Sequence, residues 1–155
     1  MKKIAVIIAR AGSKRIPNKN MKKFLGQPII KRVIKILKKT KMFNDIYIST
    51  DSLKIGNYVK KLGVKFTFLR PKHLANDFSD TTDVMQHASM YLKKIKKNYN
   101  FDVCCVYPTA IFTKMDDLKK SHKLFTKNKF EYLFCAAPFE YPFQRGFYLK
   151  KNKVN

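Results

Sequence analysis

The residues best suited to chemistry lie in one short segment near the N-terminus, ARAGSKRIPNKN (residues 9–20). Its cations are Arg10, Lys14, Arg15 and Lys19. Gly12 and Ser13 stand between the first two, and a glycine lets backbone amides approach an anion to which the cations donate hydrogen bonds. The segment matches neither GxxxxGK[ST] nor GxGxxG. It predicts phosphate binding, and the alternative is a solvated basic loop in a chain that is basic throughout.

The cysteines and histidines do not form a metal-binding pattern. The three cysteines, Cys104, Cys105 and Cys135, stand inside apolar runs, which predicts buried thiols of a reducing compartment and no disulfide framework. The three histidines, His73, His87 and His122, have no cysteine or carboxylate at ligand spacing. We therefore expect no histidine-based metal site.

The basic segment follows a continuous apolar run, KKIAVIIA (residues 2–9), which is typical of a buried parallel strand. Further strands are expected at residues 45–50, 64–69, 101–107 and 131–137. Helices are expected at 28–37, at 53–62 with Gly63 ending it, at 81–97 with Ser79 or Asp80 as its cap, and at 116–128. This alternation predicts a single α/β domain over residues 1–155, a doubly wound and mostly parallel sheet with helices on both faces. Ligands of such sheets bind at the carboxyl ends of the strands, where the basic segment begins.

The charge balance is strongly basic, with 34 Lys and Arg residues against 10 Asp and Glu residues and a net charge of +24. Such a charge is compatible with nucleic-acid binding. However, 29 of the cations are lysines spread along the chain, so solvating surface lysine is an equal alternative. No apolar run approaches the roughly 20 residues of a membrane span, and the N-terminus lacks the long apolar stretch of a secretory signal. We expect a cytoplasmic protein without membrane contact.

Several segments, in order and in spacing, resemble a known family. IIARAGSKRIPNKN (residues 7–20) is similar to the N-terminal signature of the nonulosonic-acid cytidylyltransferases, the CMP-sialic acid synthetase family. FLGQP (24–28), ISTD (48–51) and YPTA (107–110) match further motifs, and so does LRP (69–71) with Leu74, Asp77 and Thr81. The resemblance runs from about residue 3 to residue 150 and implies a nucleotide-diphospho-sugar transferase-like, Rossmann-like fold.

Within this family the chain resembles the pseudaminic acid cytidylyltransferase branch most. VCCVYPTAIF (103–112) and YPFQRGF (141–147) are similar to segments of that branch, although Ile111 replaces a proline. The related KDO cytidylyltransferases have a different sequence where this chain has Lys19-Asn20, which argues against KDO as the substrate.

The resemblance implies a reaction between CTP and the anomeric hydroxyl of a nine-carbon 2-keto sugar acid of pseudaminic or sialic type, giving a CMP-sugar and pyrophosphate. It assigns catalysis to Arg10 and Lys19. It assigns nucleotide binding to Arg10, Gly12, Ser13, Lys14, Lys19, Asn20, Arg70 and Thr81. It assigns sugar binding to Tyr107, Gln144 and Arg145, of which Arg145 is suited to pair with the sugar carboxylate.

The resemblance also implies Mg²⁺ as cofactor and a homodimer. The chain corresponds to roughly the N-terminal two thirds of the family's domain, and it ends before the Asp-x-Asp pair that usually binds the metal. Asp51 belongs to the ISTD motif and Asp116-Asp117 begin a helix, so no metal ligand is assigned and the activity of this chain stays open.

Two other functions stay open at this point. One is a basic nucleic-acid-binding α/β protein, and the other is a nucleotide-binding remnant of the family without catalysis. A nucleic-acid surface gathers its cations on one face, whereas Arg10, Arg15 and Arg70 lie at expected strand ends or in adjoining loops. This distribution favours a nucleotide pocket.

Overall fold

The structure is a computed structural model that describes residues 1–97, 100–138, 140, 149–150 and 153–154. Its backbone falls into two compact units, Met1–Lys120 and Ser121–Asn155. The first unit contains a three-stranded parallel sheet, and the residues that follow from its strands form the candidate site. Along the described chain, no helix has the length and apolar character needed to cross a membrane.

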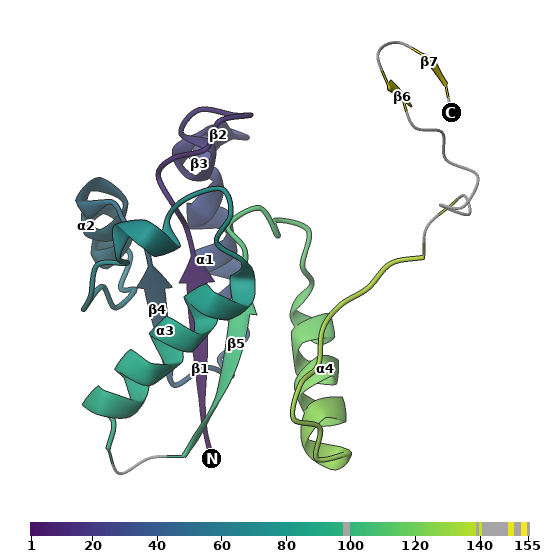
Figure 1. The fold of residues 1–155 in the computed structure, drawn as a ribbon. Coiled ribbons are helices and arrows are strands. Elements are labelled where there is room, and N and C mark those ends of the chain that lie inside the picture. Colours follow the sequence, from purple (N-terminus) through teal and green to yellow (C-terminus); the bar gives the residue numbers. More distant parts are fainter. Residues whose placement is uncertain (98–99, 139, 141–148, 151–152, 155) are drawn as a thin grey trace. The chain divides into compact units, whose positions relative to one another are not determined.

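The sheet has β1 (Lys2–Ile8) at its centre, with β4 (Asp45–Ser49) on one side and β5 (Phe101–Val106) on the other (Figure 1). Both pairings are parallel, and Ile4 is paired with Asp45 in β4 and with Val103 in β5. Residues 4–7 of β1 are completely buried. This burial on both faces explains the unbroken apolar run of its sequence.

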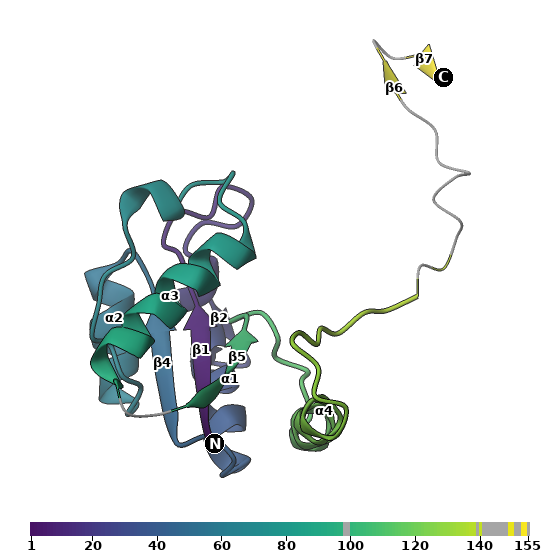
Figure 2. The ribbon, with the colours of Figure 1, turned by 60° about the horizontal axis from the view of Figure 1, so that its bottom comes forward.

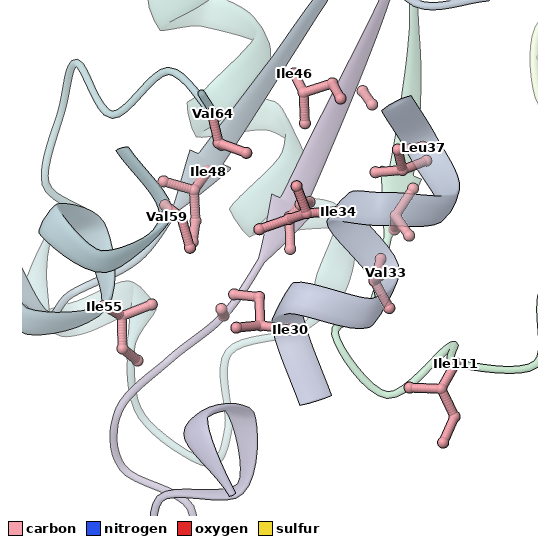
Figure 3. Close-up of a cluster of buried hydrophobic side chains, with 14 residues drawn as sticks. Ile30, Val33, Ile34, Leu37, Ile46, Ile48, Ile55, Val59, Val64 and Ile111 are labelled. Carbon is pink, nitrogen blue, oxygen red and sulfur yellow. The ribbon is translucent and has the colours of Figure 1, made fainter. Parts of the chain in front are cut away.

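Helices cover both faces of the sheet, as the sequence predicts (Figure 2). On one face, α1 (Ile29–Lys39) and α2 (Leu53–Lys61) pack against Ala5 and Ile7 in a large apolar cluster (Figure 3). On the other face, α3 (Thr81–Ile95) packs against Ile4 and Val6. Successive residues of β1 thus serve opposite faces, and the expected α/β arrangement is confirmed.

Capping residues explain where α2 and α3 begin and where α2 ends. Of the two caps expected for α3, Asp80 is the one that forms, because its carboxylate accepts a hydrogen bond of 2.8 Å from the backbone N–H of Asp83. Ser52 caps α2 in the same way, through the N–H of Ile55. Gly63 follows the end of α2 with a φ of +72°, the left-handed conformation expected of a glycine there.

The connections contain short elements. The 3₁₀ helix η1 (Lys19–Met21) precedes the two-residue strands β2 (Lys23–Phe24) and β3 (Gln27–Pro28), and η2 (Lys72–Leu74) precedes α3. Helix α4 (Met115–Lys127) begins in the first unit and continues into the second, which also contains the antiparallel strands β6 (Leu149–Lys150) and β7 (Lys153–Val154).

The expected strand at residues 64–69 is wrong except for one bridge, between Lys65 and Tyr47. The N–H of Lys65 donates to Ile46 and its carbonyl accepts from Ile48, but the next bond comes from the N–H of Arg70 to the carbonyl of Thr50, just after β4, at 2.8 Å. In a regular parallel ladder residue 69 would make this bond. The segment therefore has one residue too many for the ladder, and its hydrogen bonding is interrupted.

The expected strand at residues 131–137 is also wrong. These residues are exposed, and no neighbouring strand among the described residues gives them a hydrogen-bonding partner. Cys135 lies among them, so the expectation that it is buried is wrong for the same reason, whereas Cys104 and Cys105 in β5 are partly buried.

Candidate nucleotide-binding cleft

A cleft of about 200 Å³ opens at the carboxyl edge of the sheet, within the first unit. It is formed by the loops that follow β1 and β5, by residues 70–80 and by the first turns of α3. The lining residues are Ile8, Arg10, Ser13, Lys19, Asn20, Arg70, Leu74, Asn76, Asp77, Ser79, Asp80, Thr81, Val84, Tyr107, Pro108 and Thr109. This is the place at which parallel α/β sheets bind their ligands.

The loop after β1 is anchored at both ends by hydrogen bonds that involve its backbone. The N–H of Ala9 donates to the carbonyl of Ser49, and the N–H of Ala11 donates to a carboxylate oxygen of Asp51 at 2.8 Å. Farther along, the buried side chain of Asn20 donates from Nδ2 to the carbonyl of Arg10, also at 2.8 Å. These three bonds hold the backbone of Arg10 at the mouth of the cleft.

The expected phosphate-binding cations divide into three groups. Arg10 and Lys14 form ion pairs with the two carboxylate oxygens of Asp77, and the Lys14 pair measures 2.7 Å. Lys19 lines the cleft and makes no ion pair with a carboxylate among the described residues. Arg15 is exposed and does not line the cleft. The structure thus places two of the four cations in the cleft wall and a third at its edge.

Gly12 and Ser13 form a tight turn between these cations, in which the N–H of Ser13 donates to the carbonyl of Ala11 at 2.9 Å. Ser13 lines the cleft. A Cβ atom added at Gly12 would have no atom within 4 Å, so no packing in the protein itself requires a glycine there. The open space leaves room for a ligand to approach the backbone.

Arg70 lies in the cleft wall but is buried, with 5% of its surface exposed. Its Nη2 donates to the carbonyl of Ser49 at 2.6 Å and its Nε to the Ser49 hydroxyl at 3.0 Å. Burial lowers the pKa of Arg70, and the neighbouring Asp51 carboxylate opposes that effect. Arg70 therefore ties residues 65–70 to β4 and also places a positive charge behind the cleft.

Thr81 and Tyr107 meet in the cleft, because the hydroxyl groups of the two side chains are hydrogen-bonded to one another. Thr81 is the first residue of α3 and Tyr107 follows the end of β5. Roughly half of Tyr107 is exposed, at 48%, so its ring remains available to a ligand.

A second cavity of about 160 Å³ shares Arg10 and Asn20 with the first and extends toward Ser52 and Ile55 at the start of α2. Small-molecule pockets usually measure about 300–1,000 Å³. Each cavity alone is below that range, and Arg10 and Asn20 are the wall that they have in common.

A sequence model described as "Cytidylyltransferase" matches residues 4–140, which is most of the chain. The chain belongs to the cytidylyltransferase family. It is 40% identical to the pseudaminic acid cytidylyltransferase of Campylobacter jejuni over 152 residues, covering 98% of this chain and 65% of that protein. It is 33% identical to the CMP-N,N'-diacetyllegionaminic acid synthase of Legionella pneumophila, covering 83% of this chain and 56% of that protein.

A solved structure of a CMP:2-keto-3-deoxy-manno-octonic acid synthetase with CTP has the same fold, with a TM-score of 0.64 and 21% identity. The match covers 83% of this chain and 49% of that one. This cytidylyltransferase chain spans less than two thirds of the length of the curated relatives it matches, at 65% of the Campylobacter jejuni protein.

The site of this cytidylyltransferase chain gathers most of the residues expected from the sequence. Those that line the cleft are Arg10, Ser13, Lys19, Asn20, Arg70, Thr81 and Tyr107. Lys14 reaches it through Asp77, and Gly12 lies in the adjoining turn. Two of the three expected sugar-binding residues, Gln144 and Arg145, lie outside the described residues, so those assignments stay predictions.

The described residues do not fit a magnesium site by themselves. They contain no group of three or more histidine, cysteine, aspartate or glutamate side chains placed to hold a metal ion. Asp77 lines the cleft, but Arg10 and Lys14 occupy both of its oxygens, and Asp80 uses its carboxylate to cap α3. Mg²⁺ is usually held by one or two carboxylates together with substrate phosphates and water, and both of these carboxylates already have partners in the protein.

Sequence reasoning missed the role of residues 73–80 in the site. Asn76 accepts hydrogen bonds at Oδ1 from the N–H groups of Phe78 and Ser79, both at 2.8 Å, and its Nδ2 donates to the carbonyl of His73. Asparagine commonly makes such side-chain-to-backbone hydrogen bonds in turns. The sequence Asn-Asp-x-Ser was therefore the signal from which this turn could have been predicted. The turn presents Asp77 to the cations of the first loop.

Proposed function

We propose that this chain is a cytidylyltransferase that joins CTP to a nonulosonic acid of pseudaminic or sialic type, giving a CMP-sugar and pyrophosphate. The observation that carries the proposal is the cleft at the carboxyl edge of the sheet, lined by Arg10, Lys19 and Asn20, in a chain 40% identical to a pseudaminic acid cytidylyltransferase. The identity to a legionaminic acid synthase supports the wider substrate class.

In the proposed reaction the anomeric hydroxyl oxygen of the sugar attacks the α-phosphorus of CTP. A new oxygen–phosphorus bond forms, the bond from the α-phosphorus to the bridging oxygen breaks, and pyrophosphate leaves while the hydroxyl proton passes to solvent or a base. Negative charge builds on the departing pyrophosphate. Arg10 and Lys19 line the cleft and are suited to stabilise that charge, since preorganised cations stabilise developing charge strongly.

The remaining cleft residues fit the rest of the substrates. We propose that Asn20, Arg70 and Thr81 face the nucleotide, and that Tyr107, which is hydrogen-bonded to Thr81, lies nearer the sugar. Arg145 stays our prediction for the partner of the sugar carboxylate. Magnesium also stays a prediction, tested by comparing turnover with added Mg²⁺ and with EDTA.

The first test is a calorimetric titration of CTP into the wild type, Arg10→Ala and Arg15→Ala. Both variants remove one arginine from the same loop, but only Arg10 lines the cleft. We expect roughly 10- to 100-fold weaker binding for Arg10→Ala, because a charge-assisted contact is lost, and a change of less than about twofold for Arg15→Ala. Equal weakening in both variants would indicate general electrostatic attraction and contradict a specific pocket.

Pyrophosphate release with CTP and pseudaminic acid then tests the reaction itself. Release that depends on both substrates supports a synthetase, whereas saturable CTP binding without release supports a non-catalytic nucleotide-binding protein. A heparin competition at rising salt separates these outcomes from nucleic-acid binding, since a polyanion surface releases its ligand steeply with salt.

We propose further that the protein acts in the cytoplasm as a homodimer. The assembly is tested by light scattering on the full chain, and a monomer at assay concentrations with full turnover would contradict it.

A further inference from the structure

Asp77 faces the loop that carries the candidate phosphate-binding cations, and both of its carboxylate oxygens are occupied by them. One oxygen accepts a hydrogen bond from Nη2 of Arg10, and the other lies 2.7 Å from Nζ of Lys14. Arg10 also donates from Nη1 to the backbone carbonyl of Asn76. Two of the cations expected to hold a triphosphate are therefore held by the protein's own anion.

A carboxylate and a phosphate offer the same recognition features, a negative charge with oxygens that accept from a guanidinium or an ammonium group. The Lys14 ammonium, and after it the Arg10 guanidinium, hold the pKa of the Asp77 carboxyl below its usual value. Asp77 is consequently ionised at neutral pH. It competes with any anion that approaches the same two side chains.

The position of Asp77 does not depend on these ion pairs alone. The turn around it is fixed by the bonds of Asn76 to Phe78, Ser79 and His73, and by the bond from the Ser79 hydroxyl to the carbonyl of His73 at 2.9 Å. When a ligand takes Arg10 and Lys14 away, Asp77 remains in the cleft wall. It then places a like charge beside the bound phosphates, which disfavours their binding.

We propose that Asp77 is an internal competitor of the triphosphate, which holds Arg10 and Lys14 in the free protein and weakens the binding of CTP and pyrophosphate. This inference rests on the proposed function, because it assigns these cations to the phosphates of CTP. Its consequence for turnover is faster release of pyrophosphate, since the leaving anion is replaced at Arg10 and Lys14 by the Asp77 carboxylate.

The test is a titration of inorganic pyrophosphate, with EDTA present, into the wild type, Asp77→Asn, Asp77→Glu and Asp83→Asn. Asp83 lies in the first turn of α3 and does not line the cleft, so Asp83→Asn changes the net charge equally without touching the competitor. We expect Asp77→Asn to bind pyrophosphate roughly threefold to tenfold more tightly, because two partly exposed ion pairs, with Arg10 and Lys14, are lost. Asp83→Asn should differ by less than about twofold, and Asp77→Glu should restore weak binding.

Unchanged or weaker pyrophosphate binding in Asp77→Asn would overturn the proposal, and weaker binding would indicate that Asp77 orients the cations for the ligand. Asp77→Ala is the control for a new contact made by the amide of the introduced asparagine. If removal of the carboxylate is what matters, Asp77→Ala must also bind pyrophosphate more tightly. Circular dichroism melting identifies a variant that fails to fold, and in that case Asp77→Ser, which also removes the charge, replaces it.

The outcome is independent of catalysis. Tighter pyrophosphate binding in Asp77→Asn together with no CMP-sugar formation in the wild type would sustain the competitor and refute the proposed reaction. CMP-sugar formation by the wild type, together with equal pyrophosphate affinities of the wild type and Asp77→Asn, would refute the competitor and sustain the proposed reaction. In an active enzyme, Asp77→Asn should lower KM for CTP without raising kcat, which a purely structural role of Asp77 would not do.

Discussion

Replacing Gly56 with alanine tests the packing of α2 against residues 64–70. Gly56 is buried in the middle of the helix, and a Cβ atom there would lie 2.5 Å from Cδ1 and Cζ of Phe66 and closer still to Cε1. Carbon atoms in favourable contact are about 3.5–4.0 Å apart. The Phe66 ring or the helix must therefore move by about 1 Å to admit the methyl group.

Two opposing effects set the magnitude. Alanine favours a helix interior over glycine by about 1 kcal/mol. Overpacking a well-filled core costs about 1–3 kcal/mol. With a middle value of about 2 kcal/mol for the overlap with an aromatic ring, Gly56→Ala should lower the free energy of unfolding by about 1 kcal/mol.

Urea denaturation followed by circular dichroism measures this change. Asn57→Ala, at the next and exposed position of α2, is the matched control, and it should raise stability by a few tenths of a kcal/mol through helix propensity alone. The double variant Gly56→Ala with Phe66→Leu should be more stable than the sum of the single effects predicts, because a smaller side chain relieves the overlap. If Gly56→Ala proves as stable as Asn57→Ala, the close approach of Phe66 does not exist and the reasoning fails.

Three further predictions concern sites away from the cleft. Leu25 is exposed and has a φ of +48° in the turn before Gly26, so Leu25→Asn should raise the free energy of unfolding by about 1 kcal/mol in the same denaturation assay. Burial raises the pKa of Cys105 to about 11, whereas Cys135 is exposed. Iodoacetamide at pH 8 should therefore modify Cys135 first and Cys105 only on unfolding, which peptide mass spectrometry measures. Burial lowers the pKa of His87, whose buried Nδ1 has no hydrogen-bond partner among the described residues. The unfolded chain therefore takes up a proton more readily than the folded chain does. The free energy of unfolding should fall as the pH drops below about 6.5. His87→Leu should reduce that fall in melting experiments between pH 7 and pH 5, and an identical pH profile would contradict the assignment.

The sequence predicted those parts of the fold in which local pattern and tertiary burial agree. The run before Arg10 is buried on both faces, and the apolar positions of α1 recur at helical spacing and pack on the sheet. The sequence limits the N-cap of α3 to Ser79 or Asp80, and the structure shows that Asp80 is the cap. In each case the residues that determine the element are close together in the sequence.

The failures arose where a strand depends on a partner elsewhere in the chain. Residues 64–69 have the composition of a strand, but their register against β4 contains one extra residue, which no local pattern reveals. Residues 131–137 have the same kind of composition and no paired neighbour among the described residues. Whether a segment becomes a strand depends on hydrogen bonding to a neighbouring strand, and the sequence of the segment alone does not determine that pairing.

The sequence analysis assigned the cations of the candidate site, whereas it named Asp77 only as part of a matched motif and gave it no role. The cluster around Arg10 was visible because four basic residues lie within ten positions. Asp77 stands 67 residues after Arg10, and only the fold brings its carboxylate to that side chain. A contact of this kind requires the geometry of two loops that meet across the sheet edge.

The way in which the first loop is anchored bears on how new specificities arise. Its first anchors are backbone N–H groups, those of Ala9 and Ala11, and its last is Asn20 bonded to a backbone carbonyl. None of these bonds uses a side chain between residues 12 and 19. Ser13, Lys14 and Lys19, which we assign to ligand binding, lie in this stretch, so substitutions there should change the affinity for the ligand while the backbone that presents them stays in place. The fold therefore separates the groups that hold the loop in place from the side chains that can set its ligand specificity.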